Sequence, residues 1–380
     1  MRRRTFALVS AIVLAAICTH PSFATSENSV PALARLLSEL PADQSVLHVP
    51  EGIYAIGSSW TVSRAGVTIR GAGIGKTVLI RDPRFDGALV KMDAPNSSLT
   101  NLTLDGNGTA NVLFLNRPGA VADTVEVKNF THIGIAVPAS GCRVTNCLIS
   151  GPATRTTMGV WHDAGRTSFD STIVIDHNVL KNTGLYGTGG QITITSNQIT
   201  GEPNPGGGQV DVGNAFSKNT VAVITGNTIA NGGTIRTGGI ELGGGSFTVT
   251  NNIIRDHGAA GIGVGHNAIR ATIAANIISN SGHNLNDRNT PQNRSGIYVL
   301  YGAQNVEISG NRCFDDQPVK SQTWGIILAP PPTRSDPRFE PKAIDHVVIR
   351  DNDLRGNIHP EGLLDESGAR DRNISGNLLP

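Results

Sequence analysis

A four-residue phrase recurs along this chain and constrains its fold more than any other feature. The phrase reads Gly, aliphatic residue, any residue, aliphatic residue, and it is clearest at residues 239–242, Gly-Ile-Glu-Leu. Full or loosened copies occupy residues 134–137, 159–162, 184–187, 209–212, 261–264, 296–299 and 325–328. Subtracting the numbers of successive third positions gives spacings of 25, 25, 25, 30, 22, 35 and 29 residues, close to the period of one solenoid coil. The sequence therefore predicts a repeat protein with one copy per coil.

A second phrase lies between these copies and consists of an aliphatic residue, small polar residues and a final Asn. It is found at residues 194–197, 224–227, 249–252, 273–276, 308–311, 349–352 and 374–377, with a looser copy at 174–178. Asn tolerates a left-handed backbone, and stacked Asn side chains hydrogen-bond along a ladder. We therefore expect each coil to contain a strand, a tight bend at Asn and a second strand.

Short alternating β-rich runs with abundant Gly and Asn predict strands that stack in parallel from coil to coil. On these repeats, the chain resembles the right-handed parallel β-helix (pectate-lyase-like) superfamily from Val46 to the C-terminus. The resemblance implies an all-β solenoid of single coils over residues 46–380. The Asn-Thr-Asp and Asp-Asp elements of polygalacturonase-like hydrolases and the Asp-Pro-His element of mannuronan epimerases are absent, so no specific enzyme family is matched.

The N-terminus has the layout of a secretory signal peptide at residues 1–24. Three Arg residues precede an apolar run from Phe6 to Cys18, and cleavage is expected after Ala24. Residues 25–45 then form a cap segment, because Leu33, Leu36, Leu37 and Leu40 give an amphipathic spacing for one short helix that covers the open end of the solenoid. We expect a secreted or periplasmic protein.

The net charge bears on the partners of the protein, and the cysteine content bears on its disulfides. The chain has a net charge of +1 and 16% charged residues, which gives no reason to expect nucleic acid or a membrane as a partner. Beyond the signal peptide, the cysteines are Cys142, Cys147 and Cys313. A Cys142–Cys147 disulfide stays open, although small buried hydrophobes beside the Asn positions are the preferred interpretation.

The third positions of the Gly phrase carry the candidate chemistry. The two aliphatic residues of each copy face the core, so the third residue faces outward, and neighbouring third residues lie about 4.8 Å apart. This outward column reads Ala136, Trp161, Tyr186, Asp211, Glu241, Gly263, Tyr298 and Ile327. Aromatic rings beside acidic groups suit an extended glycan, because sugar rings stack on aromatic faces and sugar hydroxyls need polar partners.

Asp211 and Glu241 form the leading catalytic hypothesis. Neighbouring carboxylates push their pKa values apart, which permits one acid and one base. Glycoside cleavage uses such a pair, with one carboxyl protonating the leaving oxygen and the other acting as base or nucleophile. Trp161 and Tyr186 are then expected to bind substrate, and solvation alone is the alternative explanation of the two carboxylates.

Further polar residues near the same strands support alternative functions. A polysaccharide lyase or uronate epimerase would use Tyr298 and His266 as base and acid, and Arg294 or Arg236 to neutralise the uronate. Expected substrate-binding residues near the strand ends are Asp163, His162, Arg236 and Tyr301. Asp163, Asp211 and Glu241 are also weighed as Ca²⁺ ligands. A non-catalytic glycan-binding or structural solenoid is the third hypothesis.

Three long segments adjoin the Gly phrases, at residues 202–208, 282–294 and 329–341. Loops that exceed the coil length and gather around one strand stack usually form the walls of a binding groove. We therefore expect a polysaccharide or oligosaccharide as the partner, and a homo-oligomer is left open.

Overall fold

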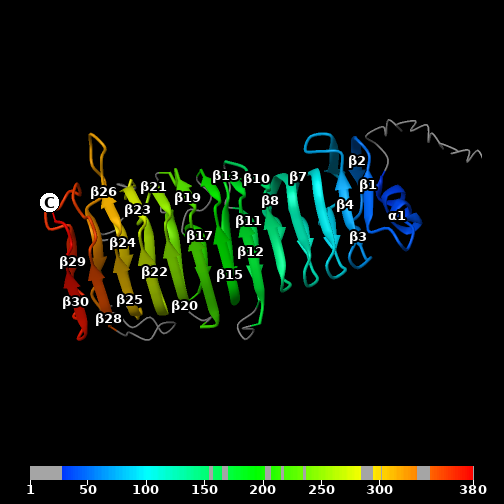
Figure 1. The fold of residues 1–380 in the computed structure, drawn as a ribbon. Helices are drawn as coiled ribbons and strands as arrows, with labels where there is room; N and C mark the ends of the chain where they lie inside the picture. Colours follow the sequence, from blue (N-terminus) through cyan, green and yellow to red (C-terminus); the bar gives the residue numbers. More distant parts are fainter. Residues whose placement is uncertain are drawn as a thin grey trace, which may run out of the picture.

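The computed structural model describes residues 28–153, 157–164, 170–201, 207–214, 218–233, 237–283, 294–300, 302–331 and 343–379, with the side chain of His266 excepted. These residues form one elongated stack of coils that runs from a helix near the N-terminus to the C-terminus (Figure 1). The described part contains 30 strands in a single sheet system, and their pairings are parallel from coil to coil. The predicted parallel solenoid is confirmed.

Each coil contributes strands to three faces. Face A carries the Gly phrases, face B carries the run that leads to each Asn, and face C follows the Asn. Face A contains β3 (Trp60–Val62), β6 (Val90–Met92), β11 (Met158–Asp163), β14 (Gly184–Thr188), β17 (Gly208–Gly213), β24 (Ser295–Val299), β27 (Trp324–Leu328) and β29 (Leu363–Asp365).

The other two faces carry short strands as well, and four longer strands bend around the coil. Face B contains β1 (Val46–Val49), β4 (Thr68–Gly71), β9 (Cys142–Thr145), β12 (Thr172–Asp176), β15 (Gly190–Thr195), β18 (Thr220–Thr225), β25 (Gln304–Ser309), β28 (Asp345–Arg350) and β30 (Arg372–Ser375). Face C contains β2 (Gly52–Ile56), β5 (Thr77–Arg81), β10 (Leu148–Ser150), β13 (Val179–Lys181), β16 (Gln198–Thr200), β19 (Thr228–Ala230), β21 (Ile253–His257), β23 (Ile277–Ser281) and β26 (Arg312–Phe314). The bent strands are β7 (Ser98–Leu115), β8 (Val121–Ala136), β20 (Gly238–Thr250) and β22 (Ile262–Ala274).

Aliphatic residues stack in columns inside the coils. Val210, Ile240, Ile262 and Ile297 are in register on successive coils, and each is fully buried. Burial of such a side chain contributes about 1.5–3 kcal/mol. The alternation within the Gly phrase thus builds the core on one side of the strand and leaves the third position on the other side.

Helix α1 (Val30–Glu39) covers the first coil, as the Leu spacing predicted. Leu33 is fully buried and Leu37 is 8% exposed, whereas Leu36 is 39% exposed. The helix packs against β1 and β3. It therefore closes the apolar end of the stack, while the expected signal peptide at residues 1–24 lies outside the described residues. No helix in the described part of the chain is long and apolar enough to span a membrane.

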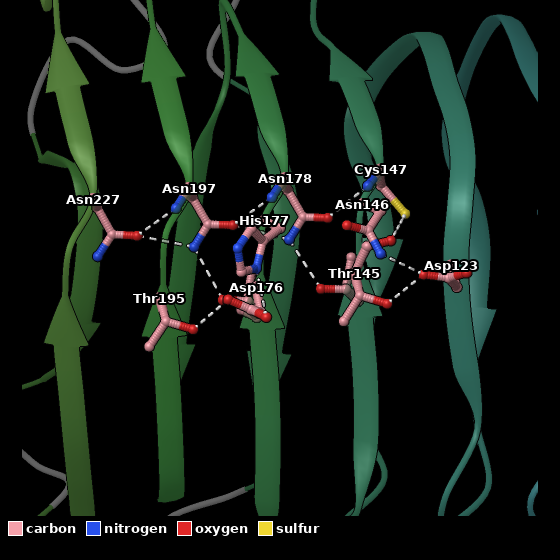
Figure 2. Close-up of polar contacts among 12 residues, drawn as sticks. Asp123, Thr145, Asn146, Cys147, Asp176, His177, Asn178, Thr195, Asn197 and Asn227 are labelled. Carbon is pink, nitrogen blue, oxygen red and sulfur yellow. Dashed lines mark hydrogen bonds and ion pairs between the residues drawn. The ribbon is translucent and has the colours of Figure 1, made fainter.

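The predicted Asn ladder is present at the bend between faces B and C, and Figure 2 shows part of it. The side-chain Nδ2 of each Asn donates to the Oδ1 of the Asn on the next coil, with distances of 2.9 to 3.0 Å. That Oδ1 also accepts the backbone N–H of the preceding Asn, for example Asn197 to Asn227 at 2.9 Å. The ladder members are Asn178, Asn197, Asn227, Asn252, Asn276, Asn311, Asn352 and Asn377.

The left-handed residue of this bend differs from the prediction. The ladder Asn was expected to adopt it, but positive φ occurs at the residue before the ladder Asn, as at Ser196 (54°), Ala275 (55°) and Asp351 (57°). The bend is held by the ladder bonds, so the residue that adopts the strained conformation need not be Asn or Gly. The ladder Asn is kept for its amide group.

The three described cysteines are free thiols in the core. Burial raises the pKa of Cys142 to about 11 and the pKa of Cys147 to about 12, and it also raises the pKa of Cys313. The Cys142–Cys147 disulfide that the sequence left open is not formed in the structure. These thiols act as small buried hydrophobes, and Cys147 lies at the end of the Asn ladder, where its backbone N–H donates to Asn178 Oδ1 at 2.9 Å.

Candidate functional site

The candidate site is the outward column of face A. Trp161 pairs with Tyr186, Tyr186 with Asp211, and Asp211 with Glu241. Glu241 then pairs with Gly263, and Gly263 with Tyr298. The predicted order of this column is thus confirmed residue by residue. Trp161, Tyr186, Asp211, Glu241 and Tyr298 are all partly exposed.

The two ends of the column are not exposed, contrary to the prediction. Ala136 and Ile327 are fully buried. Ala136 has only a methyl group, which does not rise above its neighbours, and every residue of β27 is buried on both sides of the strand. The column also continues further toward the N-terminus than the Gly phrases indicated, because Ala136 pairs with Phe114 and Phe114 with Lys91.

Asp211 is the most perturbed carboxyl group of the column. Its pKa is raised from 3.8 to about 7, chiefly by burial and in addition by the negative charge of Glu241. Both causes act against the ionised form, because a carboxylate loses hydration and meets a like charge. Asp211 therefore stays mostly protonated below about pH 7, and about half of the molecules carry this proton at pH 7.

Glu241 lies in a cradle of three glycines on three successive coils. A Cβ atom at Gly208 would lie 3.1 Å from Glu241 Cγ, one at Gly238 3.4 Å from Oε1, and one at Gly263 3.0 Å from Oε2. Any larger residue would displace the carboxyl group or crowd it. The Glu241 carboxyl group leans over the space that the missing side chain at Gly263 leaves open.

Tyr186 lies between the aromatic and the acidic part of the column. Burial raises the pKa of its hydroxyl, a hydrogen bond with Asn214 opposes this, and the charges of Asp211 and Asp163 raise the pKa further. Asn214 also donates to Thr188 Oγ1 at 3.2 Å. The sequence did not single out Asn214, because it lies just beyond β17 and outside the repeated phrase.

His162 does not face the column and its assignment to substrate binding is wrong. It is fully buried, and its Nδ1 donates to the Val137 carbonyl at 2.6 Å. Burial lowers the pKa of the imidazole. The physical reason is the strand alternation itself, since His162 takes the inward aliphatic position of its phrase.

Arg294 is engaged in a structural contact. Its Nε and a terminal nitrogen donate to the Ser321 carbonyl at 3.0 and 2.7 Å. These two bonds use two of the five N–H donors of the guanidinium group and hold the side chain against the Ser321 carbonyl. Arg236, Tyr301 and the side chain of His266 lie outside the described residues, as do residues 202–206, 284–293 and 332–341 of the expected groove walls.

The calcium hypothesis is not supported by the residues assigned to it. Asp163 pairs with Thr188, two residues further along the strand than the Trp161–Tyr186–Asp211 column. Within the described part of the chain, no three His, Cys, Asp or Glu side chains gather into a group able to hold a metal ion. The offset along the strand separates Asp163 from the two carboxyl groups of the column.

This geometry defines the chemistry that face A can perform. One carboxyl group is protonated near neutral pH, a second carboxyl group lies on the adjacent coil, and aromatic side chains extend the column to one side. A protonated and an ionised carboxyl group together supply a general acid and a base or nucleophile. The fold is a right-handed parallel β-helix.

Solved structures with similar coils support this assignment of the fold. An alginate lyase in complex with G6 has a TM-score of 0.66 at 16% identity, covering 93% of this chain and 84% of that chain. The A-module of a mannuronan C-5 epimerase from Azotobacter vinelandii has a TM-score of 0.60 at 15% identity, covering 93% and 96%. A tailspike protein double mutant of an E. coli bacteriophage, in complex with a pentasaccharide, has a TM-score of 0.61 at 11% identity, covering 93% and 78%. No protein-family model and no curated protein sequence matches the chain.

Proposed function

We propose that the protein is an exported enzyme that cleaves an extended polysaccharide by hydrolysis of a glycosidic bond. The observation that carries the proposal is the pair Asp211 and Glu241, which lie in register on adjacent coils, with the pKa of Asp211 raised to about 7. A structural carboxylate on a strand gains nothing from burial beside a second acid, whereas an acid catalyst needs a proton at working pH.

Each carboxyl group is given a separate role. Asp211 is the general acid, which donates its proton to the glycosidic oxygen as the bond to the sugar carbon breaks. Glu241 is ionised, and it either removes a proton from the attacking water or attacks the sugar carbon itself. The glycine cradle leaves the space that the Glu241 carboxyl group occupies beside the coil of Asp211.

The aromatic part of the column is assigned to substrate binding. Tyr186 lies one coil and Trp161 two coils from Asp211, on the side away from Glu241. With coils about 4.8 Å apart, they suit successive sugar residues of a chain that runs along the stack. Similar folds in complex with oligosaccharides, an alginate lyase and a tailspike protein, support a saccharide as the ligand. The tailspike carries one Asp and one Glu changed to Ala, which is consistent with carboxyl groups as working residues.

The predicted signal peptide at residues 1–24 supports export. Export would bring the enzyme to polysaccharides outside the cytoplasm. No cofactor is needed for acid and base hydrolysis by two carboxyl groups.

A polysaccharide lyase or uronate epimerase is the second candidate. It is favoured by the position of Tyr298, which follows Glu241 and Gly263 in the same column, and by the similarity of the fold to an alginate lyase and an epimerase. Tyr298 and His266 would then move the proton at the carbon next to the uronate carboxylate, and Arg294 or Arg236 would neutralise that carboxylate.

A polymer screen separates these functions. The mature chain, residues 25–380, is incubated with neutral, pectic and alginate polymers, while reducing ends and ultraviolet absorbance are followed together. Hydrolysis gives reducing ends without absorbance and disappears in Asp211→Asn and in Glu241→Gln. The control Asp43→Asn removes an exposed carboxyl group beyond α1 and is expected to act like the parent protein. New absorbance that persists in both column variants would support the lyase and refute the hydrolase.

A further inference from the structure

One copy of the Gly phrase departs from all the others at its first position. That position is Gly in the copies that begin at residues 134, 159, 184, 239, 261, 296 and 325, but it is Gln209 in the copy that carries Asp211. Gln209 is fully buried. It lies at the corner where face C turns into face A, two residues before Asp211, and its neighbour Gly208 forms part of the cradle of Glu241.

Every polar atom of the Gln209 side chain has a partner. Its Nε2 donates to the Gly201 carbonyl and, at 3.2 Å, to the Ala230 carbonyl of the next coil. Its Oε1 accepts a hydrogen bond from His257 Nε2 at 2.8 Å. The two carbonyl groups require a donor, so they fix the orientation of the amide and leave the oxygen for His257.

His257 reaches Gln209 through space that two glycines leave open. A Cβ atom at Gly232 would lie 2.4 Å from His257 Cδ2, and one at Gly239 would lie 3.3 Å from His257 Cε1. Gly239 is two residues before Glu241, so the imidazole packs beneath the strand that carries the second carboxyl group. One buried ring therefore contacts the strand of Glu241 and holds the strand of Asp211.

The imidazole is neutral at any pH at which the protein would work. Burial, and after it the nearby His283 and Arg255, lower the pKa of His257 to about 3. A neutral ring that donates from Nε2 has its other nitrogen, Nδ1, as an acceptor, and among the described residues this atom has no hydrogen-bond partner. A buried polar atom without a partner costs about 1–3 kcal/mol, so this ring is retained at the expense of stability.

We propose that Gln209 and His257 form a buried tie that positions Asp211 relative to Glu241. They are positioning residues, because neither lies on the outward column. The tie links the first position of the Asp211 phrase to the strand of Glu241 by a hydrogen bond and by packing. This inference rests on the proposed hydrolytic function, which makes the relative placement of the two carboxyl groups important.

The repeated phrases offer a test variant and a matched control. Gln209→Gly restores the residue that every other copy carries. Gln322 is also a fully buried glutamine at a corner, where its Oε1 accepts from the Ser281 N–H at 3.1 Å and its Nε2 donates to Asn357 Oδ1 at 2.7 Å. Gln322→Gly therefore removes a similar tie from a coil that carries no carboxyl group in the column.

The test measures kcat and KM on the polymer cleaved by the parent protein, together with the carboxyl pKa of Asp211 by carbon-13 NMR. We expect Gln209→Gly to lower kcat by about 100-fold, as for a catalytic group displaced by about 1 Å, with KM unchanged and the Asp211 pKa shifted. His257→Leu is expected to act alike, while His257→Gln, which keeps a donor near the position of Nε2, restores most of kcat. Gln322→Gly lowers the melting temperature without changing kcat or the Asp211 pKa.

Equal effects of Gln209→Gly and Gln322→Gly on kcat and on the Asp211 pKa would overturn the positioning role. The NMR titration needs no substrate, so it tests whether Gln209 and His257 position Asp211 even when no polymer is cleaved. Failure of the proposed function has a different signature, namely activity that survives in Asp211→Asn and Glu241→Gln.

Discussion

Replacing Asp211 by Asn is expected to stabilise the folded protein in alkaline solution and to leave its stability unchanged in acid. The pKa of Asp211 is raised from 3.8 to about 7, chiefly by burial and further by Glu241. Below about pH 4 the carboxyl group is protonated in both the folded and the unfolded chain, so it contributes no pH dependence. Between about pH 4 and pH 7 the folded chain keeps the proton and the unfolded chain releases it. The free energy of unfolding therefore falls as the pH rises through this window.

The size of this effect follows from the same shift. One pKa unit corresponds to about 1.4 kcal/mol, so a shift of about 3 units costs the parent protein about 4 kcal/mol above pH 7. Asp211 is partly exposed, and water at the carboxyl group reduces this value, so we expect a difference of about 2–4 kcal/mol. Asn keeps the shape and carries no charge, and it removes the pH-dependent cost.

Urea unfolding of the parent protein and of Asp211→Asn, measured at intervals from about pH 4 to pH 8, tests this reasoning. The difference in the free energy of unfolding should be near zero at the acid end and grow until about pH 7. In Glu241→Gln the second cause of the shift is gone, so the step should be smaller and should end at a lower pH, while it still begins near pH 4. A difference between parent and Asp211→Asn that stays constant over this range would refute the assigned environment of Asp211.

Three other predictions concern the fold. Asn252→Ala removes the ladder bonds on both sides and leaves a buried backbone N–H without a partner. It should therefore lower the free energy of unfolding, measured in urea, by about 3–5 kcal/mol. Asn377→Ala at the end of the ladder should cost clearly less, and equal losses would argue against a continuous ladder. Leu33→Ala should lower the free energy of unfolding by about 2–5 kcal/mol, whereas Leu36→Ala, at an exposed position, should lower it by about 0.5 kcal/mol. Similar losses in the two variants would argue against the capping role of α1. The cysteines at positions 142, 147 and 313 should react with a thiol reagent only after unfolding, and fast reaction of the native protein would contradict their burial.

Much of the fold and the order of the candidate site were predictable from the repeated phrases. Aliphatic residues two apart must both face the core, so the residue between them faces outward and its neighbours on other coils follow from alignment of the phrases. This logic placed Asp211 beside Glu241 and Tyr186 correctly. Applied consistently, it also places His162 inward, and assigning that residue to substrate binding ignored its position in the phrase.

Other features of the structure could not be predicted from the repeated phrases. The left-handed residue of each bend varies between Ser, Ala, Asp and other residues, because the ladder bonds stabilise the bend and leave that residue's type free. The burial of Ile327 depends on what covers β27 from outside, which alternation along one strand does not report. Gln209 was visible as an exception to Gly, but its partner His257 is 48 residues further along the chain.

The sequence by itself determined the coil, the register and the identity of the outward column, because these depend on periodicity within single strands and on its repetition. The tertiary structure alone decided the charge state and placement of the column residues. The proton on Asp211, the glycine cradle of Glu241 and the buried contact between Gln209 and His257 each need atoms from two or more coils. Desolvation and packing act through space, and residues that lie one coil apart in space are separated in the chain by a whole turn of the solenoid.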